Sequence, residues 1–220
     1  MIRTGSMWTL LKSQYQSIYS SPNKDKIVSS PQEFFSLKNA SQQLDSLQID
    51  RQDIVEALGQ LSPNSSPGPD AVPTILLKLC KRSLAKPLEI VFRHFLETGT
   101  VPSILKEAFV VPVHKGGDRS SSSNFRPVSL TSHIIKTLER VVRKTLANHL
   151  EVNNKFNPAH HGFRNNRSCL SQLLEHYNKI LSFLEAGENV DSIYLDFAKA
   201  FNKVDIRILC HKHREIGISG

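Results

Sequence analysis

Residues 190–205, VDSIYLDFAKAFNKVD, hold a carboxylate at the end of an apolar run. The stretch from Val190 to Phe197 is rich in apolar and β-branched residues and predicts a core strand. A carboxylate buried in such a strand is costly unless a positive group compensates it. Asp196 is therefore either a ligand for Mg²⁺, with the Phe197 carbonyl as a second hard oxygen, or the N-cap of a helix expected from Lys199 onward.

Charge is distributed unevenly along the 220 residues. The chain has 28 Lys and Arg against 20 Asp and Glu, a formal net charge of +8, and the whole excess lies in residues 61–220. A basic surface suits a polyanionic partner. The three cysteines lack the spacing of a disulfide framework or a zinc site, and no window has the length and apolarity of a membrane helix. We expect a soluble, intracellular protein without a membrane partner, in either the nucleus or the cytoplasm.

Apolar periodicity predicts a helix-rich fold with a few strands. Residues 1–50 are expected to be a poorly structured lead-in. Residues 51–61 read as a short amphipathic helix capped by Asp50, and residues 62–73, with four prolines, as a stiff corner. Two helices divided at Pro87 follow up to Gly99. A strand, a flexible tip and an extended return are then expected in residues 108–131, with further helices over 132–150 and 168–186.

The segment KGGDRSSSSNFRP, residues 115–127, places Lys115 and Arg126 on either side of a Gly/Ser-rich tip. Two such cations can close over a phosphate chain, with Lys as a point charge and Arg as a planar fork. An ordinary solvated hairpin has the same composition, so this segment alone leaves both interpretations open. It does not match the P-loop pattern, which argues against a Walker-type ATPase.

The segment NPAHHGFRNNRSCLSQLL, residues 157–174, has arginines around a tight turn that precedes a helix. Arg164 and Arg167, beside Phe163, are candidates for contact with a nucleic-acid backbone. Phe163 as a core residue is the alternative. The adjacent His160 and His161 lack the helical spacing of a zinc pair and are expected to be surface histidines with satisfied hydrogen bonds.

Four motifs occur in the order typical of one family. They are SPGPDAVP, VVPVHKGGDRSSSSNFRPVSLTS, HGFRNNRSC and YLDFAKAFNKVD, with a closing IGISG. From about Ile54 to its last residue, the sequence resembles the reverse transcriptases of non-LTR, LINE-type retrotransposons. The resemblance implies an α+β right-hand polymerase fold. Residues 51–189 would be the fingers-like part, and residues 190–220 the first palm strand and the start of the following helix.

The resemblance also implies roles for the singled-out residues. In that family the aspartate of the first palm strand is a catalytic ligand of both Mg²⁺ ions, and this position is Asp196, with the Phe197 carbonyl lending a further oxygen. Phe201 matches the aromatic gate beneath the incoming sugar. Lys115 and Arg126 match the fingers residues that hold the triphosphate. The implied partners are an RNA template, a DNA primer and a dNTP, whereas the oligomeric state is not implied.

A second group of positions matches a fingers segment near the template and the nucleotide. These positions are Gly162, Phe163, Arg164 and Arg167. The sequence also departs from the family pattern, in ways that suggest the drift of an ageing element copy. The departures are Asn202 for the second aspartate of the palm motif, Ile206 for its histidine, His160 for a glutamine, and Ala71 for the glycine that often follows SPGPD.

The sequence ends at Gly220, before the segment where the family carries its YxDD strand, and it contains no YxDD or FxDD. We therefore expect a fragment of an RNA-directed DNA polymerase that is inactive alone, with the missing palm and thumb supplied by a longer chain. The alternative is a non-enzymatic element remnant with weak nucleic-acid binding. An in-frame YxDD segment downstream would favour the first, and a stop codon the second.

Overall fold

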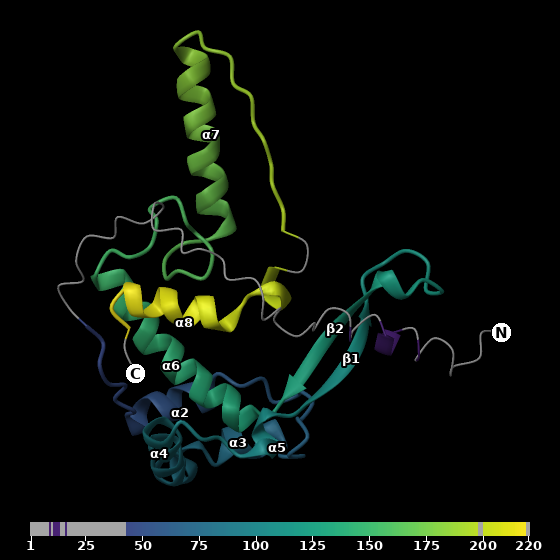
Figure 1. Cartoon of the computed structure of the whole chain (residues 1–220), viewed down its shortest axis with the longest axis vertical. Helices are drawn as coiled ribbons and strands as arrows, with labels where there is room; N and C mark the ends of the chain where they lie inside the picture. Colours follow the sequence, from purple (N-terminus) through teal and green to yellow (C-terminus); the bar gives the residue numbers. More distant parts are fainter. Residues whose placement is uncertain (1–8, 10, 14–15, 17–42, 198–199, 219–220) are drawn as a thin grey trace. The chain divides into compact units, whose positions relative to one another are not determined.

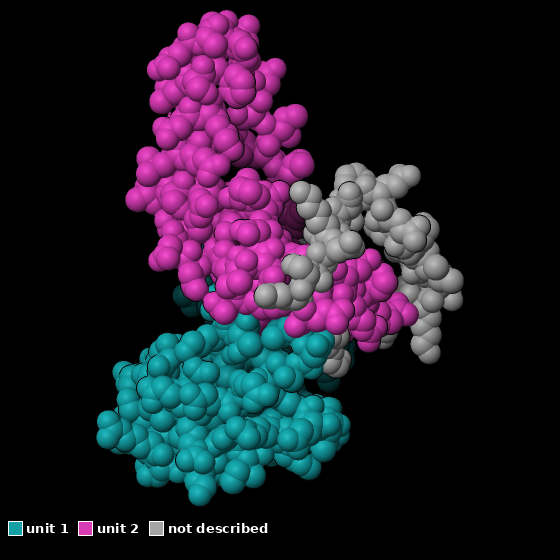
Figure 2. Space-filling view, turned by 90° about the vertical axis from the view of Figure 1, so that its left-hand side faces the viewer, with its two compact units in different colours: residues 1–36, 44–145, 219–220 teal, residues 37–43, 146–218 magenta. Residues whose placement is uncertain are grey.

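The computed structural model describes residues 9, 11–13, 16, 43–197 and 200–218, so the lead-in predicted over residues 1–50 falls mostly outside the described residues. The chain forms two compact units, coloured separately in Figure 2. Unit 1 comprises residues 1–36, 44–145 and 219–220, and unit 2 comprises residues 37–43 and 146–218. Within the described part, no helix is both long and apolar enough to cross a membrane.

Unit 1 combines a helical cluster with one antiparallel hairpin. Its elements in chain order are α2 (Arg51–Gly59), α3 (Thr74–Leu79), α4 (Lys81–Thr98), α5 (Ser103–Lys106), β1 (Ala108–His114), the 3₁₀ turn η1 (Ser122–Asn124), β2 (Phe125–Thr131) and the first part of α6 (His133–Val152). Figure 1 shows the hairpin projecting from the helices of this unit, with its tip at the far end.

The core of unit 1 lies between α2, α4 and α6. Helix α2 begins as predicted, because the Asp50 carboxylate accepts a hydrogen bond from the Gln52 backbone N–H. Ile54 and Leu58 on its apolar face are fully buried. They pack in one cluster with Phe92 of α4 and Val141 of α6. The predicted helix and its buried face are therefore confirmed.

The boundary between the next two helices differs from the prediction. Pro87 lies inside α4, and the break falls at Cys80, between α3 and α4. A proline within a helix removes one backbone hydrogen bond, but here Leu88 and Phe92 beyond it are buried in the core. Packing of that apolar face keeps the helix continuous through Pro87. Gly99 ends α4 with a left-handed φ of 63°, as expected of a C-terminal glycine.

The loop between α2 and α3 is attached to the junction between β2 and α6. A Cβ on Gly68 would lie 2.5 Å from the Ser132 backbone nitrogen, so only glycine allows this approach. The Ser132 hydroxyl donates to the Asp70 carboxylate and accepts from the Ile134 N–H at 3.1 Å, which caps α6. His133 Nε2 donates to the Ser66 carbonyl at 3.0 Å. The proline-rich corner is thus anchored as well as stiff.

Unit 2 holds the end of α6, the helix α7 (Cys169–Glu185), the 3₁₀ turn η2 (Ala200–Lys203) and α8 (Ile206–Glu215). Ser168 caps α7 in a reciprocal capping box with Ser171. The helices predicted over 132–150 and 168–186 are therefore confirmed. After α7 an extended segment runs back beside the helix (Figure 1), where His176 Nε2 and the Tyr194 hydroxyl lie 3.2 Å apart.

The strand predicted over residues 190–197 is not formed. These residues have no regular secondary structure, and Ile193, Leu195 and Phe197 are each more than four-fifths exposed. A strand requires a neighbouring backbone with which to pair. Among the described residues the only sheet is the hairpin of β1 and β2, so the apolar run has neither a paired edge nor a covered face.

We predict that Ala71→Gly stabilises the protein. Ala71 has a φ of 54°, a conformation that costs an L-residue roughly 1–2 kcal/mol but is free for glycine. The greater flexibility of glycine in the unfolded chain offsets about 0.4–1 kcal/mol of this gain. Since 1 kcal/mol shifts the melting temperature of a chain of this size by about 2–4 °C, the melting temperature measured by circular dichroism should rise by roughly 1–4 °C.

The matched control is Ala147→Gly, which places the same residue inside helix α6. It should lower the melting temperature, because glycine in a helix interior costs about 1 kcal/mol. An Ala71→Gly protein that melts at or below the parent would contradict the strain assigned to Ala71.

Candidate functional site

Lys115 and Arg126 lie on the same face of the hairpin. Val113 of β1 pairs with Arg126 of β2. Lys115 follows two residues later, and its backbone N–H donates to the Asn124 carbonyl at 2.8 Å, which extends the ladder past β1. Because alternate residues of a strand share a face, Lys115 and Arg126 are diagonal neighbours. Both side chains are exposed, so the structure brings these two predicted nucleotide-binding residues together.

The tip beyond Lys115 has a defined internal structure. Gly116 and Gly117 adopt left-handed φ values of 120° and 78°, which lets the chain turn directly after β1. The Asp118 carboxylate accepts from the Ser120 hydroxyl and from the Ser120 N–H, and these two bonds lower the pKa of Asp118. The Asn124 amide donates to the Asp118 carbonyl at 2.8 Å. The serine-rich tip is therefore folded back onto the base of β2.

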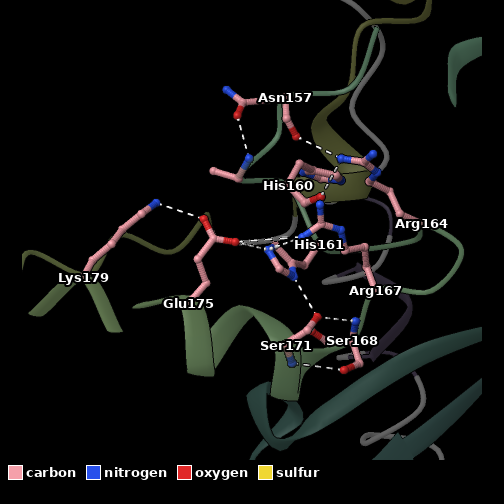
Figure 3. Close-up of polar contacts among 10 residues, drawn as sticks. Asn157, His160, His161, Arg164, Arg167, Ser168, Ser171, Glu175 and Lys179 are labelled. Atoms are coloured by element: carbon pink, nitrogen blue, oxygen red, sulfur yellow. Dashed lines mark hydrogen bonds and ion pairs between the residues drawn. The ribbon is translucent and has the colours of Figure 1, made fainter. Parts of the chain in front are cut away.

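Arg164 holds together the segment that connects α6 with α7. Its Nε and one terminal nitrogen form a bidentate pair with Glu151, at 3.0 and 2.8 Å. The other terminal nitrogen donates to the carbonyls of Asn157 and His160 (Figure 3), and the guanidinium lies 5.1 Å from the centre of the Phe156 ring. This arginine, predicted to contact nucleic acid, has most of its donors engaged within the fold.

His161 is buried, with only 3% of its surface exposed, and is not the surface histidine that the sequence predicted. Figure 3 shows its ring between Ser171, 2.8 Å from Nδ1, and Glu175, 2.9 Å from Nε2. Its two ring nitrogens are satisfied, as predicted. Hydrogen bonds from Lys179 and then His161 lower the pKa of the Glu175 carboxyl. The turn before α7 is thus tied to the helix at its first and second turns.

Arg167 lies at the edge of this network and remains one-third exposed. Its guanidinium is 3.4 Å from His161 Nε2 and 3.9 Å from the Glu175 carboxylate. Both contacts are long compared with those of Arg164, so several donors of Arg167 can still reach a phosphate. Gly162, between the two arginines in sequence, is exposed, and a Cβ there would meet only ordinary contacts with His160.

Phe163 and Phe201 contact each other in unit 2. Their ring centroids are 6.1 Å apart with an interplanar angle of 87°, an edge-to-face arrangement. Phe163 is 75% exposed and has a φ of 60°, so it is not the core residue considered as an alternative. Phe201 is 80% exposed. The structure thus brings together the aromatic residue predicted near the template and the one predicted beneath the sugar.

Asp196 and Phe197 are exposed in the extended segment that replaces the predicted strand. The expectation of a buried carboxylate at the end of a strand is therefore wrong. Asp196 does not cap a helix either, because α8 has Asp205 as its N-cap. A carboxylate and a carbonyl are the oxygens that Mg²⁺ prefers. The two oxygens are of the right type for the ion but too few to hold it, because the described residues contain no group of three side chains suited to a metal.

The predicted site residues are divided between the two units. Lys115 and Arg126 belong to unit 1, whereas Asp196, Phe201 and the turn at 162–167 belong to unit 2. Sequence reasoning missed Glu151 and Glu175, which orient the arginines and histidine of that turn. Neither carboxylate carries a motif. Glu175 lies four residues before Lys179, and that spacing was the one signal that could have drawn attention to it.

The chain resembles known proteins along most of its length. The family model described as reverse transcriptase (RNA-dependent DNA polymerase) matches residues 113–220. A probable RNA-directed DNA polymerase from transposon BS of Drosophila melanogaster is 29% identical over 155 residues, which cover 70% of this chain and 17% of that protein. Residues 113–220 thus carry the sequence pattern of the reverse transcriptase family. The family predicted from the ordered motifs is confirmed.

Two further relatives of this chain come from other elements. The RNA-directed DNA polymerase from mobile element jockey of Drosophila funebris is 27% identical over 154 residues, 70% of this chain and 17% of that protein. The retrovirus-related Pol polyprotein from type-1 retrotransposable element R2 of Popillia japonica is 29% identical over 172 residues, which cover 77% of this chain and 22% of that protein. The chain thus spans between a sixth and a quarter of the length of these curated relatives.

We predict that the Arg164–Glu151 pair makes the chain sensitive to acid. The hydrogen bond from Arg164 holds the pKa of Glu151 below its usual 4.5. A carboxyl whose pKa is lowered by folding stabilises the fold above its usual value and loses that contribution as the pH falls through the lowered one. Glu151→Gln should therefore melt below the parent from pH 7 to pH 5, and this difference should shrink below about pH 4.5.

The control is Glu185→Gln, an exposed carboxylate at the end of α7. Its melting temperature should follow that of the parent across the same pH series. A Glu151→Gln protein that matches the parent at pH 7 would show that the pair contributes nothing to stability.

Proposed function

We propose that this chain is part of an RNA-directed DNA polymerase that transfers a nucleotide from a dNTP to a primer 3′ end on an RNA template. The observation that carries this proposal is the hairpin, which presents Lys115 and Arg126 on one exposed face at its tip. Two cations at this spacing suit the adjacent phosphates of a nucleoside triphosphate. The hairpin lies at the start of the region, residues 113–220, that matches the family model.

Unit 2 would supply the other contacts. Phe201, in edge-to-face contact with Phe163, offers an aromatic surface for the sugar of the incoming nucleotide. Arg167, whose contacts with His161 and Glu175 are long, would approach a backbone phosphate near the template. Gly162 would allow that backbone to approach closely. Arg164 would act indirectly, by holding the turn that carries Phe163.

Asp196 and the Phe197 carbonyl would contribute oxygens to a Mg²⁺ site. When bound, the metal would neutralise charge on the phosphates and lower the pKa of the attacking hydroxyl. The chain's own residues would hold the triphosphate and orient the sugar. One carboxylate cannot complete a site for two ions, and the 220 residues contain no YxDD or FxDD sequence. We therefore propose that the isolated chain does not polymerise.

A second candidate is a non-enzymatic element remnant that binds nucleic acid weakly. The left-handed φ of 54° at Ala71 favours it, because this position requires glycine for an unstrained turn and the family often has glycine there. A chain under no selection for activity would accumulate such substitutions. The two candidates predict different behaviour of the hairpin toward nucleotides.

We predict no primer extension by the purified 220-residue chain on poly(rA)/oligo(dT) with Mg²⁺ and dTTP. The reason is the single carboxylate that it provides for the metals. The product is followed by denaturing gel electrophoresis of a labelled primer, with a complete reverse transcriptase as the positive control. Extension that tracks the protein through purification would refute the argument from the missing carboxylates.

We also predict that the chain binds this primer-template in a salt-sensitive manner and that the hairpin cations respond to nucleotide. Lys115→Ala with Arg126→Ala should weaken binding severalfold more in the presence of dTTP than in its absence, as measured by fluorescence anisotropy. Lys106→Ala with Arg214→Ala, two exposed cations elsewhere, should show no such dependence. Equal weakening with and without dTTP would make the hairpin cations plain backbone contacts and favour the remnant.

A further inference from the structure

A hollow of about 810 Å³ lies in unit 1 between α2 and α4. It exists because the side chains below it are small or apolar, namely Val55 and Gly59 of α2 and Ala85 of α4. Gly59 adopts ordinary helical geometry, so no turn requires a glycine here. Gly59 is the last residue of α2, and because it has no side chain it leaves the space in which the Lys81 ammonium lies.

The rim of the hollow is basic. Arg51 and Glu56 on the α2 side are already paired, with Glu89 and Lys144 respectively. Lys81 and Arg82 on the α4 side have no ion pair or hydrogen bond from their side chains among the described residues. The hollow therefore carries two positive charges that have no partner in the part of the chain that the structure describes.

These two cations stand where they disfavour the helix. They occupy the first turn of α4, which has no acidic residue, and the positive end of the helix dipole repels cations there. Arg82 is also four residues from Lys86, a like-charge spacing that destabilises helices. The Lys81 ammonium lies beside Gly59 at the C-terminal end of α2, where the helix dipole favours a cation. Arg82 has no such compensation, and an anion bound in the hollow would supply its counter-charge.

We propose that the hollow between α2 and α4 binds the backbone of a single-stranded nucleic acid, with Lys81 and Arg82 on its phosphates. Lys81 and Arg82 are neighbours in sequence, so they can meet successive phosphates of one strand, and a positively charged groove that follows the backbone is the usual form of a single-strand site. Two amides on the rim, Gln52 and Gln60, can hydrogen-bond to base edges or to a 2′-hydroxyl. This proposal rests on the proposed function only in assuming that the chain binds nucleic acid.

The first test measures binding of a fluorescein-labelled 15-nucleotide oligo(U) to the whole chain, without nucleotide or metal. Lys81→Glu with Arg82→Glu should weaken binding at least tenfold at 0.1 M salt. It should also reduce the slope of log K against log[salt] by about 1.4, since each phosphate contact on a single strand contributes about 0.7. Lys106→Glu with Arg214→Glu makes the same change in net charge outside the hollow and should retain most of the affinity.

The second test fills the hollow without changing its charge. A Cβ at Gly59 would lie 3.4 Å from the Lys81 ammonium, an ordinary contact, so Gly59→Ala should bind oligo(U) like the parent. Gly59→Leu should fill the space and weaken binding severalfold. Circular dichroism and thermal melting establish that both variants are folded.

Several outcomes would overturn the proposal. Unchanged binding by the charge-reversed protein excludes these cations, and unchanged binding by Gly59→Leu shows that oligo(U) follows diffuse charge rather than the hollow. Competition by an oligoglutamate as effective as unlabelled oligo(U) makes this a general anion site. Because no dNTP is present, failure of the proposed role of Lys115 and Arg126 leaves these measurements unaffected.

Discussion

The contact between Gly68 and the backbone at Thr131 and Ser132 fixes the architecture of unit 1. No side chain fits there, because a Cβ would lie 2.5 Å from backbone atoms on the other side. The contact occurs where β2 ends and α6 begins, so it sets the direction in which the hairpin leaves the helical core. The Asp70–Ser132 hydrogen bond and the cap of α6 hold the same junction. The position of Lys115 and Arg126 therefore depends on a loop far from them in sequence.

Unit 2 is organised differently, by polar contacts rather than by an apolar core. Arg164 joins the connecting segment to α6, and the buried His161 joins it to α7. Helix α7 itself has no buried residue, and its leucines at 170, 174 and 181 are each more than half exposed. Bidentate and charge-assisted hydrogen bonds give specific geometry even where little apolar surface is buried. The turn that carries Phe163 and Arg167 is therefore shaped by carboxylates.

Local signals predicted the elements that depend on local physics. The Asp50 cap and the Gly-Gly turn of the hairpin each act within a few residues, and each is present. The strand at 190–197 failed because pairing requires a partner backbone, which periodicity does not reveal. Pro87 failed as a helix boundary because core packing outweighed its local preference. The same limit applies to Arg164, whose partner Glu151 lies 13 residues away.

Net charge overstates how much basic surface is available to a ligand. Lys144 pairs with Asp53 and Glu56, Arg140 donates to the Ala57 carbonyl, and Arg164 is held by Glu151. Such cations stabilise the fold, and the excess of +8 includes them. A cation available for phosphate lacks a partner of its own and stands where the fold gains nothing from it. By that criterion the hairpin tip and the start of α4 are two places in unit 1 where basic side chains remain available to a ligand.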